Sequence, residues 1–464
     1  MTALWTSREI ATATGGIAGA AFSASGVAFD SREIEPGHLF VALRGEATDG
    51  HLFVEQAFAR GASGALVSQP VHVPHVLVPD TMRGLEALGT ASRARTAARI
   101  TGVTGSVGKT GTKEALRRAL ERSAPGGVHW SVKSYNNHTG VPLSMARMPV
   151  DTRYAVFEMG MNHKGELAAL TCLVRPHVAI VTWIAPAHRE FFASEEEIAD
   201  SKAEIFEGLE SGGAAIIPYD SSHCGRLAKH ARAHGARVIT FGQAKGADVR
   251  AVHVGAGRDG GSLVSAEIAG DDGGRTLTFS IGMPGAHWVN NALAVIAAVD
   301  ALGGDLAAAG LALADFRGLA GRGQQRLVPV PGGTVRLIDE SYNANPASMA
   351  AALQVLGETA AAGRKIAVLG AMRELGAASD DYHAALAQPV LASGAAYALL
   401  VGPEMASLAK ALGSAIAVQH LPDAKAAEAA LGEILAAGDA VLIKGSNSVG
   451  LGRLVSALAE GVGV

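Results

Sequence analysis

The segment Thr104-Gly105-Ser106-Val107-Gly108-Lys109-Thr110 lies between an apolar run, Ile100–Val103, and a helix-like run, Lys109–Leu120. Its glycines let the backbone N–H groups turn toward phosphate oxygens, and the following helix adds its positive N-terminal end. Lys109 can reach the terminal phosphates, and the Thr110 hydroxyl can bind Mg²⁺. The strict phosphate-loop pattern has Gly six positions before its Lys, where this chain has Val. An ordinary glycine-rich turn is therefore the alternative, but the Gly-Lys-Thr step between a strand and a helix favours nucleotide binding.

The rest of the chain predicts an α/β protein with three domains, covering residues 1–87, 88–318 and 319–464. Near-continuous apolar runs such as Tyr154–Met159 and Val178–Trp183 are typical of buried parallel strands. Polar and apolar residues alternate between Asp248 and Ile281, which predicts a small antiparallel appendage to the central domain. The third domain alternates strands and helices and is predicted to be Rossmann-like.

Two helices connect or open these blocks. The Ala-rich stretch Leu85–Arg99 predicts a helix that leads into the central domain, and Ser348–Glu358 predicts another in the third. Asn345 and Pro346 are a favourable helix start, because Asn caps the free N–H groups and Pro suits the first helical position.

Composition excludes several classes of protein. Charged residues make up 18% of the 464 residues and the net charge is −4, so neither nucleic acid nor an anionic membrane surface is an expected partner. The two cysteines, Cys172 and Cys224, are too few for a disulfide framework. We find no signal segment, and apolar runs are too short to span a membrane. A cytoplasmic protein is expected.

Polar residues follow two of the predicted buried strands. Glu158 ends one apolar run, and His188 follows another by a few residues. Ligands of open α/β sheets bind beyond the carboxyl ends of strands, and the phosphate loop shares that edge. Glu158, His188 and the Thr110 hydroxyl are therefore candidate metal ligands. For His188 alone, a capping or core histidine is the favoured alternative.

Lys202 lies on the apolar face of a predicted helix. The box Ser194-Glu195-Glu196-Glu197 starts that helix, and the spacing of Ile198, Lys202 and Ile205 places all three on one face. Burial lowers the pKa of an amine, and a neutral amine can take up CO₂ to form an anionic carbamate. On the pattern alone, a lysine that snorkels to the rim is favoured.

Taken together, these motifs resemble the Mur ligase family over nearly the whole chain. The resemblance is carried by the phosphate loop and by Asp30-Ser31-Arg32, Arg44-Gly45, Asp49-Gly50-His51, Tyr135-Asn136-Asn137, Glu158-Met159-Gly160-Met161-Asn162, Lys202-Ala203-Glu204, Gly285-Ala286-His287 with Asn291, Gly321-Arg322, Asp339-Glu340-Ser341-Tyr342-Asn343-Ala344-Asn345-Pro346 and Lys444-Gly445-Ser446. The chain departs from the family at Trp288, Ala371 and Asn447, where Asn, Asp and Arg are usual.

The resemblance implies an ATP-dependent ligase that activates the carboxylate of a UDP-N-acetylmuramoyl-tripeptide as an acyl phosphate and joins it to D-alanyl-D-alanine. It further implies two Mg²⁺ ions, a monomer, and an N-terminal domain that binds the UDP-sugar. The implied catalytic residues are Lys109, Glu158, His188 and Lys202, and the implied metal ligands are Thr110, Glu158, His188 and carbamylated Lys202. Implied ATP contacts are Gly105, Ser106, Val107, Gly108, Lys109, Thr110, Asn291, Arg322, Asp339 and Tyr342. Implied substrate contacts are Ser31, Arg44, Asp49, His51, Asn136, Asn137 and Asn162.

Other functions stay open at this point. A sister ligase that adds another amino acid and a folate polyglutamate synthase share the central motifs, although the Asp30-Ser31-Arg32 segment argues against the folate enzyme. A phosphate-loop switch or transport ATPase belongs to a different class and needs no third α/β domain.

Overall fold

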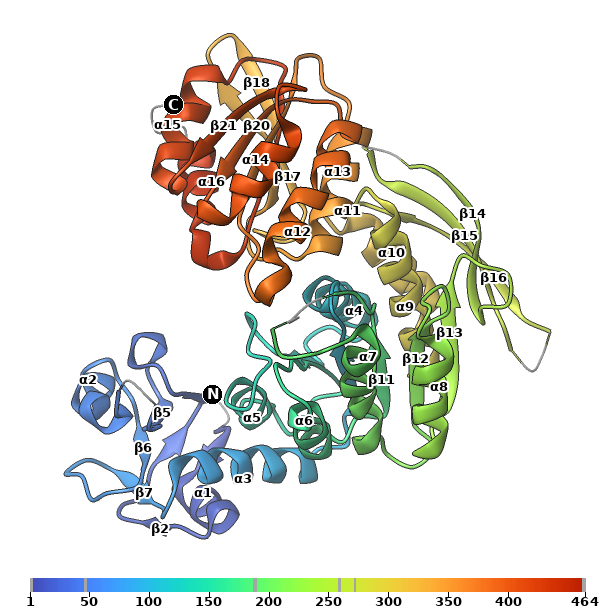
Figure 1. The fold of residues 1–464 in the computed structure, drawn as a ribbon. Helices are drawn as coiled ribbons and strands as arrows, with labels where there is room; N and C mark the ends of the chain where they lie inside the picture. Colours follow the sequence, from blue (N-terminus) through green and yellow to red (C-terminus); the bar gives the residue numbers. More distant parts are fainter. Residues whose placement is uncertain (1–2, 46–47, 187–189, 258–259, 271–272, 461–464) are drawn as a thin grey trace.

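The computed structural model describes residues 3–45, 48–186, 190–257, 260–270 and 273–460. Three α/β bodies follow one another along the chain (Figure 1). The predicted fold class, with three domains built on separate sheets, is confirmed.

The N-terminal domain is a five-stranded sheet in the order β2-β7-β6-β5-β4, parallel except for β2. Its strands are β2 (Ile17–Ala18), β4 (Gly26–Ala28), β5 (His38–Val41), β6 (Gly64–Val67) and β7 (His75–Leu77). A separate antiparallel pair is formed by β1 (Trp5–Thr6) and β3 (Ser23–Ala24), and α1 (Ser7–Thr14) and α2 (Val54–Ala59) complete the domain.

The helix α3 (Thr81–Ala94) joins the first two domains, so the boundary predicted at residue 87 lies inside a continuous helix. The predicted span Leu85–Arg99 is wrong at both ends. The Asp80 carboxylate caps the helix by accepting from the N–H groups of Met82 and Arg83, which starts it four residues earlier. At the other end, Arg99 already pairs with the neighbouring strand as the first residue of β8.

The central domain is a nine-stranded sheet in the order β16-β15-β14-β13-β12-β11-β8-β10-β9. Its strands are β8 (Arg99–Thr104), β9 (Val128–Trp130), β10 (Tyr154–Glu158), β11 (Val178–Val181), β12 (Ala214–Pro218), β13 (Arg237–Gly242), β14 (Val249–Ala256), β15 (Ser262–Ile268) and β16 (Arg275–Ile281). Strands β14 to β16 form the predicted antiparallel part, and it is continuous with the main sheet because β14 pairs in parallel with β13.

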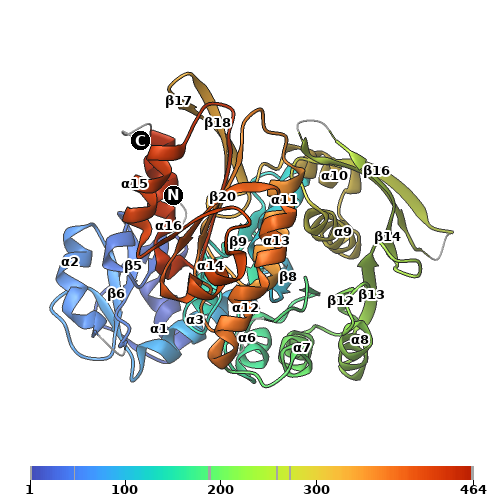
Figure 2. The ribbon, with the colours of Figure 1, turned by 45° about the horizontal axis from the view of Figure 1, so that its top comes forward.

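Helices cover both faces of the central sheet (Figures 1 and 2). They are α4 (Lys109–Ser123), α5 (Gly140–Ala146), α6 (Glu166–Val174), α7 (Glu195–Ala203), the 3₁₀ turn η3 (Glu204–Gly208), α8 (Cys224–Ala233), α9 (Ala286–Ala301) and α10 (Leu306–Asp315). One core lies between α4, α9, α10 and the sheet, and a second lies under α5 to α8. The alternate burial of successive strand residues into these two cores explains the near-continuous apolar runs in the sequence.

The C-terminal domain has a six-stranded sheet in the order β17-β18-β22-β19-β20-β21, parallel except for β17. Its strands are β17 (Gln324–Val330), β18 (Gly333–Glu340), β19 (Lys365–Gly370), β20 (Ala395–Val401), β21 (Ala417–Leu421) and β22 (Ala440–Lys444). Its helices are α11 (Pro346–Glu358), α12 (Ser379–Ala385), α13 (Ala387–Ala392), α14 (Ala406–Leu412), α15 (Ala424–Ile434) and α16 (Leu451–Glu460). As predicted, Asn345 caps α11 with Pro346 in its first turn.

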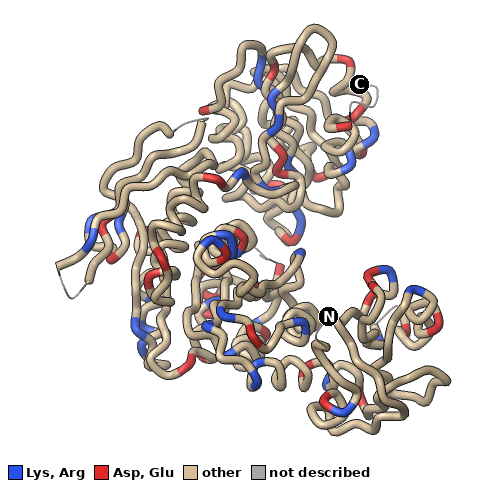
Figure 3. Tube along the Cα trace, turned by 180° about the vertical axis from the view of Figure 1, so that it is seen from behind, with Lys and Arg blue, Asp and Glu red and all other residues tan. Residues whose placement is uncertain are grey.

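Acidic and basic residues are interspersed along the Cα trace (Figure 3). Of the helices in the described ranges, none combines the length and the apolar character needed to cross a bilayer.

The N-terminal domain is fastened to the central domain through Glu33. Its carboxylate accepts from the Tyr135 hydroxyl at 2.7 Å and pairs with Lys133. Burial alone raises the pKa of a carboxyl, but the hydrogen bonds from Lys133 and Tyr135 leave the pKa of Glu33 lowered. On the other side of this contact, the Trp5 indole donates to the Ala146 carbonyl at 2.8 Å. The first domain is thus attached both to the loop that precedes α5 and to the last residue of that helix.

We expect Asp80→Ala to destabilise α3 by about 1 kcal/mol, because two N–H groups at the helix start lose their acceptor. Hydrogen exchange of the α3 amides measures this as faster local opening. Asp80→Asn keeps a capping oxygen and serves as the control. Unchanged exchange in Asp80→Ala would contradict the capping role.

Candidate active site

The phosphate loop lies between β8 and α4, as predicted. Gly105 and Gly108 have φ angles of +151° and +83°, in the region that favours glycine. Space demands glycine as well, because a Cβ on Gly105 would lie 1.9 Å from the Thr182 hydroxyl and one on Gly108 would lie 2.8 Å from Asn291 Oδ1. The loop therefore fits tightly against the start of α9 and the end of β11.

The Lys109 ammonium donates to the carbonyl of Gly105, its own loop, at 2.6 Å. Burial lowers the pKa of Lys109, and the neighbouring Glu158 partly offsets this effect. A triphosphate in the loop offers stronger acceptors than one carbonyl, so the amine can exchange this internal bond for phosphate oxygens.

Glu158 is the centre of the hydrogen bonds beside the loop. Its side chain is 1% exposed and accepts from the Thr110 hydroxyl at 2.8 Å and from the Asn136 amide at 2.7 Å. The Ser131 hydroxyl accepts from the Glu158 backbone N–H at 3.2 Å. The structure thus brings together Thr110 and Glu158, which were predicted as neighbouring metal ligands, and adds Asn136, which was predicted as a substrate contact.

Lys113 supports this group from behind, and the sequence analysis did not identify it. Its fully buried ammonium donates to the carbonyls of Ser131 at 2.6 Å and Lys133 at 3.2 Å, and pairs with Glu114 at 3.0 Å. The helix of the phosphate loop is thereby joined to the segment that carries Asn136. A lysine on the buried face of α4 was the available signal.

Lys202 is 1% exposed on α7, so the predicted apolar face is buried and the snorkelling alternative is wrong. Burial lowers the pKa of Lys202 well below its ordinary value, and Lys109 lowers it further. Of the hydrogen bonds and ion pairs found within the described ranges, none involves its amine. The predicted ligand His188 lies outside the described residues.

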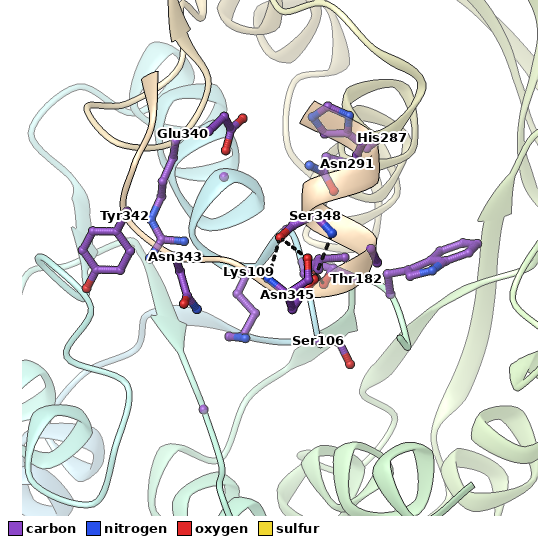
Figure 4. Close-up of a pocket in the computed structure, with 18 of the residues that line it drawn as sticks. Ser106, Lys109, Thr182, His287, Asn291, Glu340, Tyr342, Asn343, Asn345 and Ser348 are labelled. Atoms are coloured by element: carbon purple, nitrogen blue, oxygen red, sulfur yellow. Dashed lines mark hydrogen bonds between the residues drawn. The ribbon is translucent and has the colours of Figure 1, made fainter. Parts of the chain in front are cut away.

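A cavity of about 700 Å³ opens beside the loop, and both the central and the C-terminal domains line it. Figure 4 shows Lys109 and Ser106 from the loop facing Tyr342, Asn343 and Asn345 from the C-terminal domain. The predicted residues along its wall are Ser106, Val107, Gly108, Lys109, Asn136, Asn137, Glu158, Asn162, Asn291, Arg322 and Tyr342. Cavities of this size hold small-molecule ligands.

Arg322 crosses the domain junction. Its guanidinium stacks 4.0 Å from the centre of the Tyr342 ring and donates to the Ser134 hydroxyl at 3.3 Å. The two predicted nucleotide contacts Arg322 and Tyr342 are thereby placed side by side next to the loop.

Asp339 was predicted to contact the nucleotide, but it does not line this cavity. It is 3% exposed, and its carboxylate accepts from the N–H of Gly321 at 2.6 Å and from the hydroxyl of Ser341 at 2.7 Å. Asp339 therefore shapes the turns that carry Arg322 and Tyr342.

The next residue, Glu340, lines the cavity from the C-terminal domain, and the sequence had suggested no role for it. It pairs with Lys444 at 3.6 Å, and the Lys444 ammonium also donates to the Asn343 carbonyl at 2.8 Å. Burial raises the pKa of Glu340 and lowers that of Lys444, while each partner's charge opposes its neighbour's shift. Both residues end parallel strands, which was the signal available in the sequence.

Two predicted substrate contacts have local structural roles beside the cavity. The Asn137 side chain accepts from the Gly140 N–H at 2.9 Å and so caps the turn into α5. The Asn162 N–H donates to Glu166 at 2.8 Å at the start of α6.

The four predicted contacts of the N-terminal domain do not line this cavity. Asp49 pairs with Arg44 at 3.3 Å and binds His51 Nδ1 at 2.6 Å, while His51 Nε2 accepts from the Ser68 N–H at 2.9 Å. His51 thus links two loops. Ser31 donates to Gln56 at 2.9 Å. These contacts organise the end of the N-terminal sheet near Glu33.

A phosphate loop, a buried carboxylate beside it and a cavity that a second α/β domain also lines define a nucleotide-dependent enzyme with three domains. The chain matches family models of the Mur ligase family, catalytic domain, over residues 23–110, the Mur ligase middle domain over 103–299, and the Mur ligase glutamate ligase domain over 325–447. The chain belongs to the Mur ligase family.

Individual relatives agree with this assignment. The chain is 34% identical to the UDP-N-acetylmuramoyl-tripeptide–D-alanyl-D-alanine ligase of Escherichia coli, covering 96% of each chain. The Bacillus subtilis enzyme of the same name is also 34% identical, over 94% of this chain and 93% of its own. A crystal structure of MurF from Acinetobacter baumannii superposes with a TM-score of 0.85 at 29% identity. The match covers 98% of this chain and 99% of that one. The crystal structure of MurF from Thermotoga maritima in complex with ADP superposes with a TM-score of 0.77 at 25% identity. The match covers 94% of this chain and 97% of that one.

We expect Gly108→Ala to weaken ATP binding by roughly tenfold or more, because left-handed backbone costs about 1–2 kcal/mol for a residue with a Cβ. The new methyl group would also push against Asn291. Isothermal titration with ATP measures the effect. Gly126→Ala is a matched control, because Gly126 has a φ of +73° with no atom within 4 Å of the added Cβ. Equal binding by both variants would contradict the proposed fit.

We expect Lys113→Met to lower kcat/KM by about tenfold or more, because two buried carbonyls lose a charged donor and the segment holding Glu158 loosens. ATP affinity should fall less, since the loop itself is untouched. Steady-state kinetics beside ATP titration separates the two effects. The exposed Lys229→Met is the control, and a Lys113→Met enzyme with unchanged kcat/KM would exclude the supporting role.

Proposed function

We propose that this chain joins D-alanyl-D-alanine to UDP-N-acetylmuramoyl-tripeptide at the expense of ATP, in peptidoglycan synthesis. The proposal rests on the Thr110–Glu158 pair, which places a hydroxyl and a carboxylate beside the phosphate loop in a cavity shared by two domains. The relatives named above carry this activity in their names, and the chain is aligned with them over nearly its whole length.

The reaction has two steps. A carboxylate oxygen of the tripeptide forms a bond to the γ-phosphorus of ATP, the bond to the β–γ bridging oxygen breaks, and ADP leaves. The amine of D-alanyl-D-alanine then attacks the acyl carbon, loses a proton, and expels phosphate. Lys109 and the backbone N–H groups of the loop neutralise charge on the transferring phosphoryl group.

The donor set beside the loop suits Mg²⁺, because Thr110 and Glu158 offer hard oxygen ligands 2.8 Å apart. Mg²⁺ held by Thr110 and Glu158 would neutralise negative charge on the phosphates and on the carboxylate substrate. Asn136 holds the Glu158 carboxylate at 2.7 Å and so orients it toward that site. His188 is proposed as a further ligand by resemblance alone.

A carbamate on Lys202 accounts for the buried amine. A neutral amine adds to CO₂, forming a C–N bond and releasing one proton, which leaves an anion near Lys109. The lowered pKa of Lys202 provides the neutral form that this reaction needs.

Residues from the C-terminal domain complete the nucleotide site. We propose that Arg322 and Tyr342 contact ATP with Asn291, and that Asp339 acts through the turns it holds. Ser31, Arg44, Asp49 and His51 are proposed to shape the UDP-sugar site of the N-terminal domain. Water would hydrolyse an acyl phosphate, so closure of the domains over the cavity belongs to this mechanism. A cytoplasmic monomer is proposed.

Phosphate release from ATP should require both the tripeptide nucleotide and D-alanyl-D-alanine. A coupled phosphate assay with each substrate omitted in turn measures this, and tripeptides with diaminopimelate or lysine in third place identify the preferred one. Turnover with neither substrate, or turnover triggered by a protein partner, would indicate a phosphate-loop switch.

Lys202→Ala should lose most activity, because no anion replaces the carbamate, and short-chain carboxylic acids should restore part of it. Lys229 is exposed, so Lys229→Ala is the control: it should keep its activity, and added carboxylic acids should not alter that activity. Full activity in Lys202→Ala without added acid would remove the carbamate from the mechanism.

A further inference from the structure

A cluster of two histidines and a glutamate lies away from the active-site cavity. His230 is on α8, His234 caps the end of that helix, and Glu207 is in η3, which packs against α8. The nearest ligand atoms of the three side chains all lie within 4.8 Å of one another. Residues four apart on a helix share one face, so the histidines point the same way.

The contacts within the cluster leave one nitrogen unsatisfied. His230 Nε2 is shielded from solvent and has no hydrogen-bond partner within the described ranges, although Glu207 Oε1 lies 3.3 Å away. The two imidazole rings stack with centroids 4.9 Å apart. A shielded nitrogen without a partner costs free energy. A cation bound by the three side chains gives that nitrogen a partner.

We infer that Glu207, His230 and His234 bind a transition-metal ion of the Zn²⁺ type. Imidazole nitrogens suit Zn²⁺, Cu²⁺ and Ni²⁺, and one carboxylate with two histidines is a frequent set of Zn²⁺ ligands. Mg²⁺ prefers oxygen ligands, so the ion needed for ATP chemistry does not compete for this site.

The position of the site gives it a structural effect. Figure 1 shows α8 on the outside of the central domain, on the far side of α7 from the phosphate loop. The turn η3 directly follows α7, so Glu207 stands five residues after Lys202 in the same continuous segment. A metal bound here ties that segment to α8 and stabilises the folded chain, because the ligand binds only the native arrangement.

The test is isothermal titration calorimetry on the full, tag-free chain. The chain is first saturated with MgCl₂, and ZnCl₂ is then titrated into it. The wild type should bind one more equivalent of Zn²⁺ than His230→Gln, His234→Gln or Glu207→Gln. Loss of a residue that only supports a metal ligand already lowers metal affinity by roughly 10–100-fold. Loss of a ligand itself should therefore lower the affinity for this Zn²⁺ ion by about a hundredfold. His253→Gln, an exposed histidine on β14, is the matched control and should bind as the wild type does.

Absorption of the Co²⁺-substituted chain gives a second measurement that does not depend on counting equivalents. The wild type should show the visible d–d bands of nitrogen-ligated Co²⁺, and His234→Gln should lack them. Because His234 is exposed, misfolding of this variant would not explain the loss of the bands. Melting temperatures without metal confirm that each variant folds. Equal Zn²⁺ stoichiometry in wild type and His234→Gln, or Co²⁺ bands that persist in that variant, would overturn the site.

Discussion

The buried carboxylate of Glu158 is the interaction on which the active site depends. A carboxylate that is 1% exposed must be hydrogen-bonded, and it takes its donors from Thr110 and Asn136. Three segments far apart in sequence therefore converge on one point: the start of α4, the end of β10 and the loop before α5. Lys113 fastens two of these segments once more, through the carbonyls of Ser131 and Lys133.

The cavity exists because two parallel sheets present their carboxyl edges to each other. The central sheet contributes the ends of β8, β10 and β11, and the C-terminal sheet contributes Glu340 and Lys444 at the ends of β18 and β22. Single sheets of this type bind ligands beyond that edge. Here the facing arrangement gives the ligand polar groups from both sides, and Arg322 connects them.

Much of this organisation could be predicted from the sequence because it is local. The phosphate loop, the Asn345 cap of α11 and the apolar face that buries Lys202 each follow from neighbouring residues. The start of α3 was predicted four residues too late, although Asp80 is an ordinary capping residue. The prediction followed the Ala-rich run, which extends toward β8, and not the cap. For Asp339, the pattern indicated a polar residue at a strand end but not which way its carboxylate turns.

By itself, the sequence determined the three α/β domains, the nucleotide loop and the family, because these depend on periodicity and on residues close together in the chain. Only the tertiary structure decided that Asn136 and Thr110 share one carboxylate, that Lys113, Glu340 and Lys444 support or line the site, and that Glu207 meets His230 and His234. These contacts join elements tens to hundreds of residues apart. Strand order and helix packing fix such distances, and no short pattern along the chain records them.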